Sequence, residues 1–240
     1  MPQALPCPSG ASPGRCLAAV HRLRRVAAWA SLAGAGLTAL PAGAVSLGLT
    51  DSFSGGVSAG WTTGANSPNP PTGVASGGPA GTGDGFLRID SSGASGPGGR
   101  LVVFSSGPWA GNYTAAGITG ITMDVKNLGA TDLSLRLYFE NALTSAFSLQ
   151  AIALPAGSGW TPVRFDIQLP ALSGAAAATL ASAVDFRVYH HPSAGVPQVS
   201  PFIAASLGID NVSAVPEPGA ALLMALGLAA LLGWRSTPCR

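Results

Sequence analysis

Charged side chains are scarce in this 240-residue chain, at 9% of residues against about 25% in an average soluble protein. Exposed helical bundles and coiled coils need many Glu and Lys residues, so the composition excludes them. The formal net charge is only +2, which is too small to indicate nucleic-acid binding. The chain is nevertheless 47% hydrophobic, whereas disordered chains combine low hydrophobicity with high net charge.

Cysteine is absent from the middle of the chain. The three cysteines are Cys7, Cys16 and Cys239, so residues 45–214 contain none. Thiol catalysis and cysteine-ligated zinc are therefore excluded from this region. We expect a domain here to be held together by its own core or by a bound metal rather than by a disulfide.

The first 44 residues contain four arginines and no acidic residue. The arginines precede an uncharged run at 26–40, which is followed by the small residues Ala42 and Ala44 around Gly43. This order is typical of a secretory signal peptide. We predict that residues 1–44 form a signal helix with a long leader and that cleavage follows Ala44.

The last 26 residues have a different three-part pattern. Val215, Pro216, Glu217 and Pro218 come first, followed by the uncharged run 219–234 and the basic end 235–240, which begins at Arg235. A helix of 16 residues is about 24 Å long, slightly shorter than the roughly 30 Å hydrocarbon core. We predict a hydrophobic transmembrane helix at 219–234.

These three parts resemble the PEP-CTERM sorting tail of exported bacterial proteins. The family usually ends in a run of basic residues, whereas this chain has two separated arginines, Arg235 and Arg240. The resemblance implies recognition by an exosortase-type membrane enzyme and cleavage near the Pro-Glu-Pro sequence. It also implies an inner-membrane intermediate, delivery to the surface or extracellular matrix of a Gram-negative cell, and an association with exopolysaccharide.

Residues 45–214 alternate apolar and polar side chains in several segments. The clearest are 121–126, 133–140, 163–169 and 184–189. A period of two indicates strands with one face in a core and the other toward solvent. We count eight or nine strands with short connections and one short helical stretch at 175–183. The sequence therefore predicts an all-β domain, an antiparallel β-sandwich.

Three short motifs resemble the jelly roll of galactose-binding-like and laminin-G-like domains. They contain Asp51 and Phe53 at the start, Asp84 early in the body, and Asp210 with Asn211 at its end. The resemblance implies that the closing strand lies beside the opening segment. It also implies a structural calcium ion there, with Asp51 and Asp210 as ligands and Asp84 as a third. Alternatively, all three are turn residues that accept backbone N–H groups.

Glycan binding requires exposed aromatic rings with polar neighbours. Trp109 and Tyr113 lie in a glycine-rich connection, where a core position is less expected. Tyr138, Tyr189 and Arg136 fall on the polar phase of their strands, so we expect them on one outward face. Core or edge packing is the alternative explanation for each aromatic residue.

The body has neither a zincin motif nor a pair of glutamates. There is no His-Glu-x-x-His motif in residues 45–214, and Glu140 is their only glutamate. The adjacent His190 and His191 are predicted to lie in a surface turn.

We expect a non-catalytic glycan-binding or matrix-associated module that is exported and sorted through its tail. One alternative is a secreted glycan hydrolase or lyase, which a paired-carboxylate cleft would favour. The other is a structural surface protein without a ligand, which buried tryptophans and a featureless surface would favour.

Overall fold

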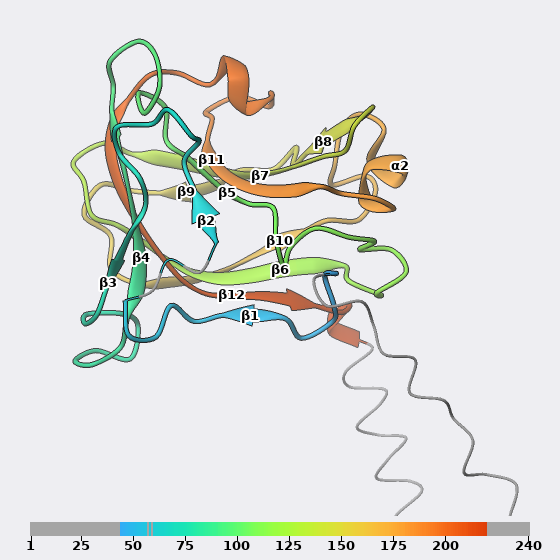
Figure 1. Ribbon diagram of the computed structural model, residues 1–240, viewed down its shortest axis with the longest axis horizontal. Helices are drawn as coiled ribbons and strands as arrows, with labels where there is room; N and C mark the ends of the chain where they lie inside the picture. Colours follow the sequence, from blue (N-terminus) through green and yellow to red (C-terminus); the bar gives the residue numbers. More distant parts are fainter. Residues whose placement is uncertain (1–43, 57, 59, 220–240) are drawn as a thin grey trace, which may run out of the picture. The chain divides into compact units, whose positions relative to one another are not determined.

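The computed structural model describes residues 44–56, 58 and 60–219. Ala42, Arg235, the predicted tail helix and nearly all of the predicted signal segment lie outside these residues. Within them the chain forms two antiparallel sheets packed face to face (Figure 1). None of the helices in this part of the chain is long and apolar enough to cross a membrane.

The first sheet, sheet A, contains the longest strand of the domain near its centre. Its order is β10-β6-β12-β4-β3, and β1 also pairs with β12. The bounds are β1 (Thr50–Asp51), β3 (Thr72–Val74), β4 (Phe86–Ser92), β6 (Gly120–Asn127), β10 (Thr161–Asp166) and β12 (Ala204–Val215).

The second sheet, sheet B, has the order β2-β5-β11-β7-β8, with β9 also paired to β7. The bounds are β2 (Trp61–Thr62), β5 (Val102–Ser105), β7 (Leu133–Glu140), β8 (Ser145–Phe147), β9 (Ile152–Leu154) and β11 (Asp185–His190). The short helix α2 (Ala176–Leu180) lies within the predicted stretch 175–183, and a 3-10 turn, η1, spans Pro197–Val199.

From β4 onward the chain passes repeatedly between the sheets, so that β4, β6, β10 and β12 lie in one layer and β5, β7 and β11 in the other. This alternation supports the jelly-roll expectation and confirms the all-β sandwich. There are twelve strands among the described residues rather than eight or nine. The unexpected ones are two or three residues long, too short to show an alternating pattern in sequence.

The core follows the period of two. In β6, Ile121, Met123 and Val125 are buried between the sheets, whereas Thr122 and Asp124 point to the other face. The core includes an aromatic cluster in which Trp61, Trp109, Phe139 and Phe186 pack against one another.

The opening and closing segments lie side by side, as the resemblance implied. Asp51 pairs with Val212, whose side chain is in the core, so Asp51 also faces the core. Asp210 pairs with Asp124 on β6 and faces the outside of sheet A. A β-bulge between Asp210 and Ser213 separates these two registers. The two aspartates therefore point to opposite faces of the sheet.

Candidate functional site

The outer face of sheet B combines aromatic rings with arginines. Arg187 on β11 lies opposite Phe104 on β5 and Tyr138 on β7. Two residues further along β11, Tyr189 lies opposite Arg136 on β7. Because cross-strand partners share a face, Arg136, Tyr138 and Tyr189 lie together away from sheet A, on the face that their phase predicted.

These three side chains are nevertheless buried, which corrects the prediction that they are exposed. Tyr189 is 0% exposed, and Tyr138 and Arg136 are 4% exposed. The segment 191–202, which contains η1, runs outside sheet B (Figure 1) and binds Arg136 through the carbonyl of His191 and Tyr189 through that of Gly195, and we call it the covering segment. Tyr189 donates its hydroxyl to the carbonyl of Gly195, and burial raises its pKa, so the hydroxyl stays protonated.

Arg136 anchors that covering segment. Its guanidinium donates to the carbonyl of His191 at 2.9 Å and to those of Ser148 and Leu149 at 2.9 and 2.7 Å. A longer bond of 3.5 Å reaches the carbonyl of Pro192. All of these acceptors are backbone atoms, so Arg136 acts as a structural clamp and is not available to a ligand.

Trp109 and Tyr113 are not in an exposed loop either, so this expectation is wrong. Both are fully buried. Trp109 donates its indole N–H to Asp51 at 2.8 Å, and Tyr113 donates its hydroxyl to the carbonyl of Trp109 at 2.7 Å. Tyr113 also packs against Phe139, with its pKa raised by burial. The glycine-rich sequence allows the chain to turn inward here. Composition alone does not distinguish such an inward turn from an exposed loop.

The prediction of a surface turn for the two histidines is also wrong. His190 is the last residue of β11 and is buried, and its Nδ1 accepts the backbone N–H of Ser134 at 2.9 Å. His191 accepts the N–H of Ser193 through its own Nδ1. Burial lowers the pKa of both imidazoles. His191 stabilises the start of the covering segment, whereas His190 connects the end of β11 to β7.

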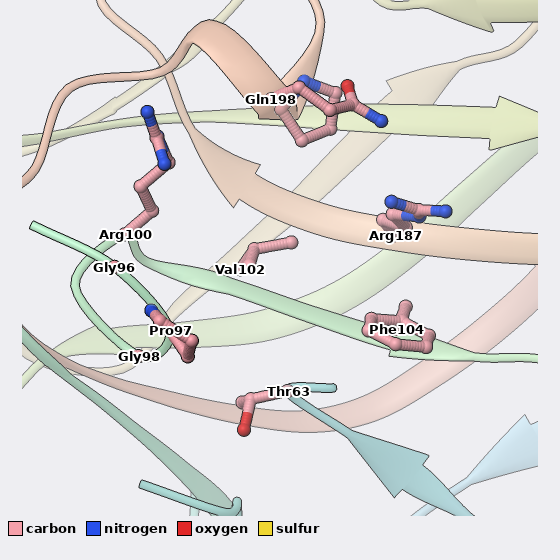
Figure 2. Close-up of a pocket in the computed structure, with 10 residues that line it drawn as sticks. Thr63, Gly96, Pro97, Gly98, Arg100, Val102, Phe104, Arg187 and Gln198 are labelled. Atoms are coloured by element: carbon pink, nitrogen blue, oxygen red, sulfur yellow. The ribbon is translucent and has the colours of Figure 1, made fainter. Parts of the chain in front are cut away.

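Beyond the edge of this segment the outer face of sheet B remains open as a cleft of about 250 Å³. Figure 2 shows Val102 and Phe104 from β5 beside Arg187, with Gln198 of η1 on one side and Thr63 on the other. The rest of the lining is Gly96, Pro97, Gly98, Arg100 and Pro197. We call this the sheet B cleft.

Arg187 is fixed in the wall of this cleft. Its guanidinium lies 5.1 Å from the ring centroids of both Phe104 and Tyr138. It also donates to Asp185, at 2.7 Å, and to Glu140. Burial opposes its charge, but the bonds and charges of the two carboxylates outweigh this and raise the pKa of Arg187. Only 16% of the side chain is exposed, so the cleft presents the edge of a rigid, charged stack.

Glu140 and Asp185 are cross-strand partners, and both bind Arg187 in the wall of the cleft. A glycosidase needs two carboxyl groups separated by the scissile bond, with space for a sugar and a water molecule. Here one guanidinium occupies the position between them. The pair is arranged to hold Arg187, and this arrangement does not favour the hydrolase alternative.

Phe104, Arg100, Thr63 and Gln198 were not among the predicted site residues. Phe104 lies in β5, a strand of only four residues. Its role depends on the register that sets it opposite Arg187, and only the fold supplies that register. Thr63 and Gln198 come from connections whose positions have no periodic signal.

The predicted calcium ligands do not gather at one point. The carboxylate of Asp51 accepts the indole N–H groups of Trp61 and Trp109 at 2.6 and 2.8 Å, inside the sandwich. Asp84 accepts the N–H of Ala80 at 2.7 Å, which matches the turn-residue alternative. Among the described residues no three acidic, histidine or cysteine side chains form a group that could hold a metal.

Asp210 differs from the other two. It is fully buried, and its Oδ2 has no hydrogen-bond partner within the described part of the chain. Burial raises its pKa to about 6. The hydrogen bond from the Asn211 N–H lowers the pKa, and the charges of Asp84 and Asp124 raise it further. A buried carboxylate oxygen without a partner is costly, and a cation is one way to satisfy it.

No protein-family model and no curated protein matches this chain. Among solved structures, an exo-β-agarase matches with a TM-score of 0.51 at 10% identity, over 72% of this chain and 25% of the agarase chain. A family 11 carbohydrate-binding module from Clostridium thermocellum matches with a TM-score of 0.46 at 10% identity, over 71% of this chain and 97% of the module. The chain thus spans about a quarter of the agarase. At this identity the agarase match establishes a shared fold.

Proposed function

We propose that this chain is a non-catalytic glycan-binding module and that the sheet B cleft binds the sugar. The observation that carries the proposal is the cleft itself. Val102 and Phe104 offer apolar surface for the apolar face of a sugar ring. Gln198 and Thr63 stand on either side and can exchange hydrogen bonds with ring hydroxyls.

The comparison with the agarase supports the same class of ligand. The shared fold lies within a protein that is named for its action on a polysaccharide, although it accounts for only a quarter of that chain. The alternative of a surface protein without a ligand is favoured by the burial of Trp61 and Trp109. It is disfavoured by the cleft, because the surface is not featureless.

Affinity electrophoresis of the full-length protein in gels containing agarose, mixed-linkage β-glucan or the host exopolysaccharide tests this function. We expect retention by at least one of them, at least ten-fold weaker in Phe104→Ala. Leu143→Ala is the matched control, because Leu143 is 93% exposed and does not line the cleft. Retention unaffected by Phe104→Ala would move the site elsewhere, and no retention at all would favour the structural alternative. Released sugar in the same samples would establish the hydrolase.

We also propose that the chain is exported and that its PEP-CTERM-like tail directs sorting by an exosortase-type enzyme through the inner membrane to the cell surface. The support is the order of the sequence segments at both ends. In addition, Val215 is the last residue of β12, so the Pro-Glu-Pro sequence begins where the last strand of the domain ends. Mass spectrometry of the protein from its native cells should find Val45 as the first residue and cleavage near Pro216–Pro218. An intact tail or an uncleaved N-terminus contradicts the respective half of the proposal.

A structural calcium ion is proposed at Asp210 rather than at Asp51. Asp210 supplies the buried oxygen without a partner, and Asp84 and Asp124 are close enough to influence its charge. Calcium takes six to eight oxygen ligands, so backbone carbonyls or water must complete the set. We expect calcium to raise the melting temperature of the full-length protein relative to EDTA, in wild type and Asp51→Asn but not in Asp210→Asn. An unchanged calcium response in Asp210→Asn would contradict this assignment.

A further inference from the structure

We propose that the sheet B cleft selects acidic polysaccharides and that Arg100 binds the anionic group of the sugar. This inference rests on the proposed glycan-binding function and specifies its ligand class. The argument depends on how Arg100 differs from the other arginines of the domain.

Five arginines lie in the described residues, and in four of them at least one terminal nitrogen is bound to a carboxylate or a carbonyl. Arg88 and Arg164 each lie 2.9 Å from a carboxylate, and Arg187 holds two. Arg136 is surrounded by backbone carbonyls. Arg100 forms no ion pair within the described part of the chain, and only its Nε has a hydrogen-bond partner there. It is the arginine whose two terminal nitrogens both lack a partner in this part of the chain.

Arg100 is also held in place. Its Nε donates to the carbonyl of Ser200 at 2.7 Å, and its guanidinium carbon lies 3.8 Å from the ring centroid of Phe202. These two contacts fix the plane of the guanidinium and do not involve its Nη1 and Nη2 atoms. These two atoms can bind a carboxylate or sulfate in bidentate fashion. Because the side chain is already ordered, binding loses less conformational entropy.

The position of Arg100 suits a sugar that lies in the cleft. It lies two residues before Val102, about 7 Å along the chain, and stands at one end of the cleft (Figure 2). A ring placed over Val102 and Phe104 would direct a substituent on its edge toward this end. The carboxylate of a uronic acid or a sulfate ester is such a substituent. The shared chemistry is an anionic group on the edge of a sugar ring.

The net charge of the domain would not produce a preference for acidic polysaccharides. Residues 45–214 contain nine acidic and six basic residues, so the domain as a whole repels an anionic polymer. Near the cleft, Glu140 and Asp185 are occupied by Arg187. A preference for acidic glycans must therefore come from a local site, and removing Arg100 should remove it.

The test compares matched polymers in affinity electrophoresis with the full-length protein. Polygalacturonate is paired with its methyl ester, and a sulfated galactan is paired with agarose. We expect wild type to bind at least one acidic member at least ten-fold more tightly than its neutral partner, and the difference to shrink as salt is added. Comparing the two pairs distinguishes a carboxylate from a sulfate.

Arg100→Gln should abolish this preference, and Arg100→Lys should retain part of it, because the charge remains without the planar fork. Arg88→Gln is the matched control, since Arg88 lies on sheet A and is not in the cleft. Thermal melting of each variant checks that it is folded. Equal binding of acidic and neutral polymers by wild type, or a preference that survives in Arg100→Gln, would overturn the inference while leaving the proposed function intact. Failure to bind any polymer would overturn both.

Discussion

Asp51 connects parts of the molecule that are far apart in sequence. It lies on a two-residue strand of sheet A, and its carboxylate accepts the indole N–H of Trp61 on β2 and of Trp109 in the connection after β5. Both rings are buried, so their N–H groups have little access to water. One oxygen atom, Oδ2, therefore satisfies two donors of the aromatic core.

Replacing Asp51 should lower the stability of the domain. Asp51→Ala leaves two buried N–H groups without an acceptor, each at a cost of about 1–3 kcal/mol, so we expect a loss of about 2–6 kcal/mol in the free energy of unfolding. Urea denaturation measures this. Asp90→Ala is the control, because Asp90 forms an exposed pair with Arg88 and should change stability by less than about 1 kcal/mol. Equal effects of the two variants would refute the role given to Asp51.

His190 makes stability depend on pH. Its Nδ1 accepts a backbone N–H, and burial followed by the charge of His191 lowers its pKa. The unfolded state therefore binds more protons near and below its ordinary pKa of about 6.5, so this contribution to stability is complete above that pH and is lost as the pH falls.

His190→Asn keeps an acceptor at the position of Nδ1 but cannot be protonated. Between pH 7.5 and pH 5, urea denaturation should show a greater loss of stability in wild type than in this variant. Asp210 titrates with the opposite sign, since its pKa is raised, but it is present in both proteins and cancels in the comparison. Parallel pH profiles would count against a role for His190.

Among the elements of the fold, the segment 191–202 decides what the outer face of sheet B can bind. It covers Tyr138 and Tyr189, and its Pro197 and Gln198 line the sheet B cleft. Arg136 fastens its first residues to the strands beneath. The cleft is therefore shaped as much by this connection as by the strands.

Arg136→Ala should release that connection. We expect a loss of about 2–4 kcal/mol in the free energy of unfolding, because several buried carbonyls lose their donor. Weaker glycan retention should accompany it, since one wall of the cleft is displaced. Arg88→Ala, on the other sheet, should leave both properties nearly unchanged. Normal retention in a folded Arg136→Ala protein would show that the segment does not shape the site.

The sequence predicted the strands that are long enough to alternate, and for the clearest of them it predicted which side chains share a face. Tyr138, Tyr189 and Arg136 do share a face, and the opening and closing segments do pair. Exposure could not be predicted, because period two identifies a face and not the connection that covers it. Phe104 and Arg100 became candidates only when strand register and side-chain contacts placed them around one cleft.

At the scale of the whole molecule, the core cluster lies entirely between Val45 and Ala214. We therefore expect residues 44–219 to fold on their own in one cooperative transition. A shorter form that ends at Ala214, the boundary predicted from sequence, loses the bond of 3.0 Å from the Thr119 N–H to the carbonyl of Val215. It also loses the contacts of Arg164 and Gln168 with Pro216 and Glu217.

Urea denaturation of the two forms should show the shorter one to be less stable by about 1–3 kcal/mol. Both should unfold in a single transition, with similar denaturant dependence, because the core is the same. If the two forms have equal stability, the residues after Ala214 contribute nothing to the fold.

The position of β12 has a consequence for the order in which the molecule can form. This last strand of the domain lies between β4 and β6 and also pairs with β1. The three earlier strands are therefore joined in one sheet only after residues 204–215 have been synthesised. While the C-terminal end is still being synthesised or held, sheet A is missing its centre. Its strands then join in one late step that depends on long-range pairing, which is slow. The two halves of sheet A, β10-β6 and β4-β3, can therefore join only when residues 204–215 are available, so a chain truncated before β12 cannot complete this sheet.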